Sequence, residues 1–246
     1  MKNVIYNGNK YFNVFQKDDN TIFKFSPMSI NGWKLLNEKK LEFLNTPLAY
    51  RRLKEEEKQK FRYCNSLIKL EFLKDYVTLN NFSNISSMNK IEVLNLIKKL
   101  LELIKQMHLK NVVHSDLNPD NIMINNNLDL QIIDLDSAIV DDFISNDNIY
   151  VKDNISLKDK INNSINDDKL DIFRLLIYYL INNTFKVDDI RSLSNSNFLI
   201  LPKELKMEID AYLDLRKKFQ NGYYFEDIID ELANTDIEKN TKIKRF

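Results

Sequence analysis

The scarcity of glycine is the feature that most limits what this chain of 246 residues can fold into. The chain contains only three glycines, Gly8, Gly32 and Gly222, and they lie far apart in the sequence. A dinucleotide-binding turn of the form G-x-G-x-x-G, or a phosphate loop of the form G-x-x-x-x-G-K-[ST], cannot be built from them. Both kinds of nucleotide-binding fold are therefore excluded, and any nucleotide must be held in another way.

The composition predicts a folded protein without a nucleic-acid partner. Hydrophobic residues make up 43% of the chain, which is enough for a core in one large domain or two small lobes. The 36 basic side chains balance the 36 acidic ones, so the long-range attraction to phosphate backbones that nucleic-acid binders show is missing. The basic residues near the C-terminus are interpreted as a solvated tail: Lys242, Lys244 and Arg245.

Cysteine and histidine are too few for a disulfide framework or a zinc site. The chain has one cysteine, Cys64, and its only histidines are His108 and His114. The N-terminal residues contain no apolar run of signal-peptide length, and no stretch is apolar for the length of a membrane span. We therefore expect a cytoplasmic protein in a reducing compartment, with export by a route that needs no cleaved signal left open.

The first part of the chain predicts short strands around one helix. Residues 4–6, 11–16 and 21–25 are rich in β-formers and are separated by Asn, Asp and Gly turns. A helical pattern covers residues 33–44 and stops near Pro47. Two further predictions are a solvated, charged helix over residues 50–62 and a strand over residues 67–73.

The second part of the chain is predominantly helical. From Asn89 to Met107, apolar residues recur at helical spacing, which predicts a long buried helix, and residues 122–124 and 130–133 read as a hairpin. The polar stretch 141–169 is expected to be exposed and partly mobile. Helices are expected over residues 171–182, 203–220 and 224–233. The predicted fold class is therefore α+β.

Three polar residues stand where the core would otherwise be apolar. Asp116 follows His114 and Ser115, Asn121 begins the hairpin, and Asp134 ends its second strand. If the hairpin forms, its two ends bring these three side chains close together. Carboxylate and amide oxygens are hard ligands that suit Mg²⁺, and phosphate oxygens can complete its shell. Each residue alone is readily explained as a loop cap, but the three together predict a metal site.

At these residues the sequence resembles the protein-kinase superfamily. The stretch VVHSDLNPDN resembles the catalytic loop H-R-D-L-x-x-x-N, and IIDLD resembles the strand that leads to D-F-G. The resemblance covers roughly residues 4 to 183 and is that of a minimal, atypical, bacterial-type member. It implies a bilobal fold, with a small β-rich N-lobe over residues 1–73 and a helical C-lobe with the catalytic loop over residues 74–246.

The resemblance also implies a role for each residue of the catalytic loop and of the strand after it. The cofactors would be ATP and Mg²⁺: Asp134 would hold the metal that bridges the phosphates, and Asn121 would bind a second ion. Asp116 would orient the attacking hydroxyl, with Asn121 beside it in the catalytic loop. His114 is expected to support the loop from the core rather than to act as a base, and His108 to be a surface or packing residue.

Further roles follow from other matches to the superfamily. TIFK resembles the strand that carries the phosphate-binding lysine, here Lys24, and its ion-pair partner would be Glu38, with Glu42 one turn on as a rival. LIKLEFL resembles the strand entering the interlobe hinge, so Glu71, Phe72 and Leu73 would offer backbone groups to an adenine ring. The buried helix DIFRLLIYYL would brace the catalytic loop through its leading aspartate, Asp171.

Departures from the superfamily leave the acceptor open. Only Gly8 stands where several glycines are usual, Asn118 replaces a lysine that touches the transferred phosphate, and Asp136 replaces the glycine of D-F-G. Ser115 stands where regulated kinases have arginine, and no A-P-E motif follows. The first hypothesis is transfer of the γ-phosphate of ATP to a protein Ser or Thr. The alternatives are a saccharide, glycolipid or other small-molecule hydroxyl, and a catalytically inactive binding module. An activating partner protein is compatible with each hypothesis.

Overall fold

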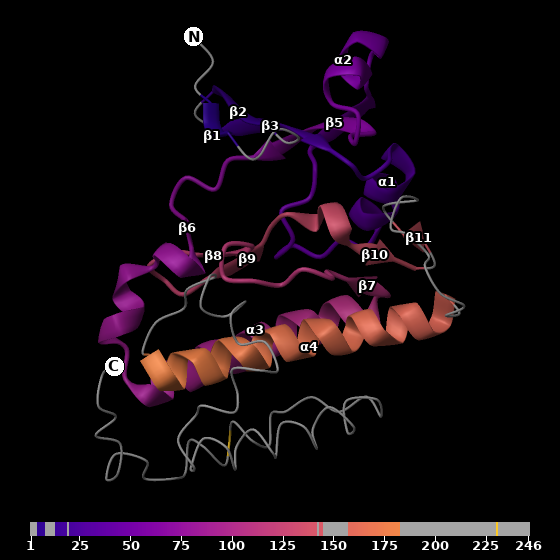
Figure 1. Ribbon diagram of the computed structural model, residues 1–246. Helices are drawn as coiled ribbons and strands as arrows, with labels where there is room; N and C mark the ends of the chain where they lie inside the picture. The colour runs from indigo at the N-terminus through magenta and orange to yellow at the C-terminus, as the bar shows by residue number, and fades with distance from the viewer. Residues whose placement is uncertain are drawn as a thin grey trace.

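The computed structural model describes residues 4–7, 13–18, 20–141, 143–144, 157–182 and 230. The structure belongs to the α+β class. A five-stranded antiparallel sheet lies on one side of the molecule, and the long helices α3 and α4 lie side by side on the other, with short strands between them (Figure 1). Among the described helices, none has both the length and the apolar character that crossing a membrane requires.

The five-stranded sheet has the order β1-β2-β3-β5-β4. Its central strands β3 and β5 pair over their whole length, from Thr21 opposite Glu71 to Ser26 opposite Ser66. The strands predicted over residues 4–6, 21–25 and 67–73 are confirmed with small shifts of their ends, and the strand predicted over residues 11–16 is present from residue 13, since residues 11 and 12 lie outside the described residues. The strands of this sheet are β1 (Val4–Asn7), β2 (Asn13–Asp18), β3 (Thr21–Ser26), β4 (Ala49–Arg52) and β5 (Ser66–Glu71).

Helix α1 (Ile30–Glu38) packs on this sheet and is shorter than predicted. It begins at the N-cap Ser29, whose side chain accepts a hydrogen bond from the Gly32 amide, and the backbone turns to a positive φ of 51° at Lys40. The helical pattern continues to residue 44, but Leu44 instead forms a parallel bridge with Ile132 and is buried. Packing against the hairpin therefore overrides the local preference for helix.

The charged stretch 50–62 was predicted to be one helix, and that prediction is wrong in its first part. Residues 49–52 form the edge strand β4, and the helix α2 (Glu55–Lys60) begins after Leu53. Leu53 is buried with Phe25, Phe61 and Cys64 in a small separate core. Burying Leu53 and Phe61 in this core anchors both ends of a helix that itself buries no residue.

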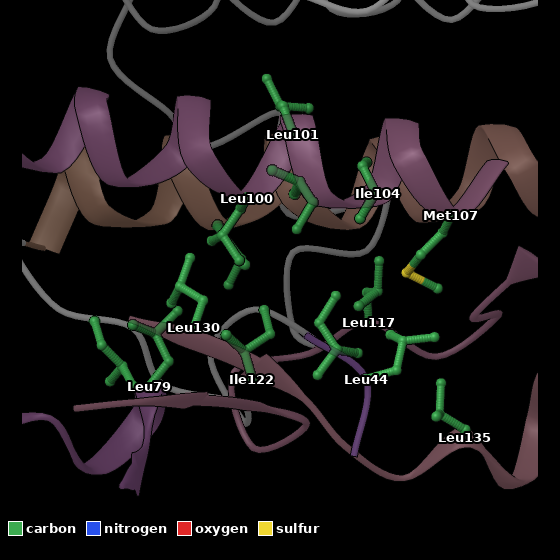
Figure 2. Close-up of a cluster of buried hydrophobic side chains, with 14 of the residues drawn as sticks. Leu44, Leu79, Leu100, Leu101, Ile104, Met107, Leu117, Ile122, Leu130 and Leu135 are labelled. Atoms are coloured by element: carbon green, nitrogen blue, oxygen red, sulfur yellow. The ribbon is translucent and has the colours of Figure 1, made fainter. Parts of the chain in front are cut away.

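The long predicted helix and the hairpin are both confirmed. Helix α3 (Lys90–Leu109) begins with a capping box, in which Asn89 and Glu92 exchange hydrogen bonds with each other's backbone amides. Strands β8 (Ile122–Ile124) and β9 (Leu130–Ile132) pair antiparallel. Leu100 and Met107 of α3 point toward the hairpin and the loop before it, whereas Leu101 points away from them (Figure 2). The buried residues labelled there are Leu44, Leu79, Leu100, Leu101, Ile104, Met107, Leu117, Ile122, Leu130 and Leu135.

Short strands and turns complete the region between the sheet and the helices. One small sheet has the order β6-β8-β9 and the other has the order β11-β10-β7. The remaining elements are β6 (Val77–Thr78), the 3-10 turns η1 (Leu79–Asn81), η2 (Ser83–Ser87) and η3 (Leu135–Ser137), β7 (Val112–Val113), β10 (Ile139–Val140) and β11 (Phe143–Ile144).

Helix α4 (Leu157–Asn182) begins much earlier than predicted. The segment over residues 141–169 was predicted to be exposed and partly mobile; residues 157–169 are helical, with Asn162, Asn163 and Asp167 exposed as predicted, while residues 142 and 145–156 lie outside the described residues. Asp168 and Lys169 are buried, so the prediction of exposure is wrong at these two residues. The helices predicted over residues 203–220 and 224–233 lie outside the described residues, except for Asp230.

Candidate active site

Lys24 brings the sheet and the hairpin together at one cluster of charges. Its ammonium nitrogen Nζ lies 2.6 Å from Asp134 Oδ1 and 2.6 Å from Asp136 Oδ2. Lys24 projects from β3, whereas the two aspartates follow β9. Asp134 lies 110 residues after Lys24 in the chain. The predicted convergence of Lys24 and Asp134 is present, and Asp136 joins them.

A left-handed turn at Asp134 allows both aspartates to reach one lysine. Asp134 has φ 58° and ψ 54°, a conformation that a non-glycine residue adopts at some cost. The chain then enters the 3-10 turn η3, which contains Asp136. The ion pairs to Lys24 offset the cost of the turn, since a buried ammonium without a partner would be far more expensive.

Burial and charge shift the pKa values in this cluster in opposite directions. Burial acts to lower the pKa of Lys24, but Asp136 and Asp134 outweigh it and raise that pKa above its ordinary value. Burial acts to raise the pKa of Asp134, but Lys24 holds it below the ordinary value. For Asp136, burial raises the pKa despite the contact with Lys24, and Asp134 adds to the rise. The pKa values of two carboxylates that share one cation move apart in this way because the two negative charges repel each other.

The loop after β7 holds Asp116 through two amide side chains. Asn118 Nδ2 donates to Asp116 Oδ1 at 3.2 Å, and Asn121 Nδ2 donates to Asp116 Oδ2 at 3.3 Å. Asn121 Nδ2 also donates to the Asp116 carbonyl oxygen at 2.9 Å. Each carboxylate oxygen of the exposed Asp116 therefore has an amide donor that fixes its orientation. The Asn121 amide oxygen Oδ1 stays as the atom that could bind a cation.

A backbone hydrogen bond ties this loop to the strand that carries Asp134. The Ile133 amide donates to the Asn121 carbonyl oxygen at 2.9 Å. Residue 133 directly precedes Asp134, so Asn121 and Asp134 are held close together. The structure thus brings the expected set of Asp116, Asn121 and Asp134 to one region, with Lys24 facing Asp134 from the sheet.

His114 is a structural residue of the loop. It is fully buried; its Nε2 lies 2.9 Å from the Ile133 carbonyl oxygen, and the Asp116 amide donates to its Nδ1 at 3.3 Å. Because a carbonyl oxygen can only accept and a backbone amide can only donate, His114 carries its proton on Nε2 and accepts at Nδ1. Both ring nitrogens are occupied, which agrees with the prediction that His114 supports the loop.

Asp168 braces the loop, and the prediction that gave this role to Asp171 is wrong. The amides of His114 and Ser115 each donate to the Asp168 carboxylate at 2.8 Å, and His108 Nε2 lies 3.1 Å from it. Asp168 is fully buried, and His108 is buried with it rather than at the surface. Asp171 lies one turn further along α4 and pairs with Arg174 at 2.7 Å.

The signal for Asp168 was in the sequence. The run DDKLD places aspartates three residues apart, on neighbouring positions of one helix face. The apolar run from residue 171 predicts a helix that begins at Asp171, which is why the role was assigned to that aspartate. Once α4 is seen to begin at Leu157, Asp168 becomes an internal helix residue that faces the loop.

Glu38 does not lie beside Lys24. Glu38 is the exposed last residue of α1, and the rival Glu42 is exposed beyond the end of the helix. The buried residues of α1 are Gly32, Trp33 and Leu36, so the helix presents no carboxylate toward the core. The expected ion pair between Lys24 and the helix is not formed, and Asp134 and Asp136 take its place.

The residues that the sequence predicts to form the hinge lie where the sheet ends. Glu71 is the last residue of β5, and its carbonyl oxygen accepts a hydrogen bond from Asn45 Nδ2 at 3.3 Å. The Phe72 amide donates to the Asn20 carbonyl oxygen, and the Leu73 carbonyl oxygen accepts from the Tyr76 amide. Residues 8–12, which would cover the phosphates, lie outside the described residues.

Residues 54–151 match the family model described as protein kinase domain. The matched range contains Asp116, Asn121, Asp134 and Asp136, while Lys24 and Asp168 lie outside it. A search of curated proteins found no match.

Exchanging Asp168 for asparagine tests the brace. We expect Asp168→Asn to lower the free energy of unfolding by about 2–4 kcal/mol, because one backbone amide would then face an amide donor inside a buried network. Urea unfolding followed by circular dichroism measures the change. The matched control is Asp171→Asn on the same helix, and an equal loss in the two variants would contradict the assignment.

The pKa of Asp171 gives a prediction for pH dependence. Burial raises the pKa of Asp171 to about 7 and Asp168 adds to the rise, although Arg174 opposes it. The unfolded chain releases this proton near pH 4 and the folded protein near pH 7, so Asp171 makes stability fall as pH rises between about 4 and 7. Asp171→Asn should therefore raise the free energy of unfolding by about 1–3 kcal/mol at pH 8 and leave it unchanged below about pH 4. A constant difference across this range, measured by urea unfolding, would show that Asp171 does not titrate in this way.

Proposed function

Since the chain belongs to the protein-kinase superfamily, we propose that it transfers the γ-phosphate of ATP to the hydroxyl of a protein serine or threonine. The observation that carries the proposal is the cluster of Lys24, Asp134, Asn121 and Asp116. In this proposal the five-stranded sheet is an N-lobe, the helices form a C-lobe, and the cluster lies at their junction. The domain boundary would fall after Leu73.

The residues present are suited to Mg²⁺. The Asp134 side chain is 44% exposed although it contacts Lys24, so it is open to an incoming cation. Together with the Asn121 amide oxygen it supplies hard oxygen ligands of the kind that Mg²⁺ binds, with phosphates completing the shell. When bound, the cation would neutralise charge on the phosphates.

Lys24 would bind the inner phosphates. Its ammonium is buried, with a side chain only 11% exposed, and its raised pKa keeps it charged. A fixed positive charge in a poorly solvated position stabilises phosphate charge more than a solvated one would. The backbone groups of Glu71 and Leu73 are the proposed contacts for the adenine ring.

Asp116 would orient the acceptor hydroxyl. Its carboxylate is exposed and is held by amide donors from Asn118 and Asn121. It would accept the hydrogen bond of the hydroxyl and align the oxygen for attack on the γ-phosphorus. The new oxygen–phosphorus bond forms as the bond to ADP breaks, and the hydroxyl proton passes to Asp116 and then to solvent.

The presence of Asn118 in the loop favours a second class of acceptor. It stands where protein kinases have a lysine, and its amide is engaged with Asp116. The loop therefore lacks one cation near the transferred group, and α4 begins at Leu157, which leaves a short chain for a peptide-docking platform. A saccharide hydroxyl is the alternative acceptor that fits these departures, and an inactive nucleotide-binding module is the alternative without transfer.

Two substitutions separate nucleotide binding from transfer. Asp134→Ala should abolish the Mg²⁺-dependent part of ATP binding in calorimetry, because the metal loses its carboxylate. Asp116→Ala should leave ATP affinity within about twofold of the native value and lower the transfer rate by about 10²-fold or more. Transfer is followed by intact-mass measurement of the protein with ATP and Mg²⁺, and by ADP release with protein and glycan acceptors.

Asp120→Ala is the matched control, because Asp120 is an exposed aspartate of the same loop. It should bind and transfer as the native protein does. Equal transfer rates in the Asp116→Ala variant and the native protein would contradict the mechanism. Native protein that binds Mg²⁺ and ATP without any transfer would favour the inactive module.

A further inference from the structure

We propose that Asp136 is the positioning residue for Lys24, in the place where the superfamily resemblance led us to expect a helix glutamate. This inference rests on the proposed phosphotransferase function, because it concerns how the phosphate-binding lysine is held. It adds a residue to the site that neither the motif nor the family match assigns.

Strand β3 holds both oxygens of the Asp136 carboxylate. Oδ2 lies 2.6 Å from Lys24 Nζ, and Oδ1 accepts a hydrogen bond from the Ser26 hydroxyl at 2.6 Å. Lys24 and Ser26 are two residues apart on one strand, so their side chains leave the same face of the sheet. Asp136 is therefore held from two sides by the strand that carries the lysine.

Ser26 is itself fixed. It is fully buried, and its hydroxyl oxygen accepts a hydrogen bond from the Met28 amide at 3.0 Å while the hydroxyl donates to Asp136. A hydroxyl that donates once and accepts once in a buried position has little freedom to rotate. The contact from Ser26 thus restrains the Asp136 carboxylate and, through it, the Lys24 ammonium.

The two aspartates differ in their access to solvent. The Asp134 side chain is 44% exposed and the Asp136 side chain is 12% exposed. A cation that enters the site can reach Asp134, whereas Asp136 stays behind it with Lys24. The two aspartates therefore have different roles. Asp134 would bind the metal, and Asp136 would keep Lys24 in place when Asp134 no longer contacts the lysine.

Helix α1 does not hold Lys24 in place from its position in the structure. Its carboxylate Glu38 is exposed at the end of the helix, and its buried residues are apolar or glycine. The end of the helix is held by other contacts: Lys39 Nζ lies 2.5 Å from Asp141 Oδ1, and Lys110 Nζ donates to the Lys39 carbonyl oxygen. The position of α1 is thus secured without an ion pair to Lys24.

A double-mutant cycle on nucleotide affinity tests the inference. The variants are Lys24→Met, Asp136→Asn and the double variant, each titrated by calorimetry with ATP in the presence of Mg²⁺, and with adenosine, which has no phosphate. Each single change should weaken ATP binding by about tenfold, as expected for loss of one charge-assisted contact. The double variant should also be weaker by about tenfold, because Asp136 acts only through Lys24. Adenosine affinity should stay within about twofold throughout.

Four outcomes would overturn the inference. If Asp136 binds the metal instead, the two losses multiply to about 100-fold, and the Mg²⁺ concentration for half-maximal binding rises in Asp136→Asn. If Asp136 only maintains the fold, adenosine affinity falls together with ATP affinity. If native protein does not bind ATP with Mg²⁺, the proposed function fails and this inference fails with it, whereas native binding with an unaffected Asp136→Asn variant defeats this inference alone.

Two further variants guard against a failure to fold. Ser26→Ala keeps every charge and removes the restraint on Asp136 together with the acceptor of the Met28 amide, so it should weaken ATP binding by about two- to threefold and leave adenosine binding intact. The double variant Glu38→Gln with Glu42→Gln removes the carboxylate at the end of α1 and the one that follows the helix. It should bind ATP as the native protein does. A loss in the Glu38 and Glu42 variant as large as in Lys24→Met would return the role to the helix.

Discussion

The structure depends on the interaction of one buried ammonium with two carboxylates. Lys24 would be costly to bury alone, and Asp134 and Asp136 make its burial possible by pairing with it at 2.6 Å each. The lysine belongs to the sheet and the aspartates follow the hairpin, so the same interaction that satisfies a charge also sets the sheet against the helical part. One positive and two negative charges leave a net negative site, which favours a divalent cation.

A second set of buried polar contacts fixes the loop that faces this cluster. Asp168 accepts hydrogen bonds from two successive backbone amides of the loop and contacts His108, while His114 links the loop to the residue before Asp134. Behind both lies the apolar core that α3 shares with the hairpin. Buried hydrogen bonds to its backbone and packed apolar side chains therefore hold the loop in place, which is what orienting a hydroxyl requires.

Sequence reasoning succeeded where the pattern and the contacts agree. The helix from residue 90, the hairpin and the three polar residues at its ends follow from periodicity and turn chemistry, and β3 with Lys24 follows from its β-formers. The predictions failed where a contact between residues far apart in the sequence determines the local structure. The parallel bridge of Leu44 with Ile132 ends α1 early, and burial of Asp168 extends α4 into a polar stretch. The pairing of Lys24 with Asp136 was missed for the same reason, since nothing local to either residue indicates the other.

The most direct test of the account is a crystal structure of the protein with Mg²⁺ and a non-hydrolysable ATP analogue. The account predicts a metal on Asp134 and Asn121, with Lys24 Nζ contacting a phosphate oxygen while it keeps its hydrogen bond to Asp136. A structure in which Lys24 leaves Asp136 to pair with Glu38, or in which the nucleotide lies away from these residues, would contradict it.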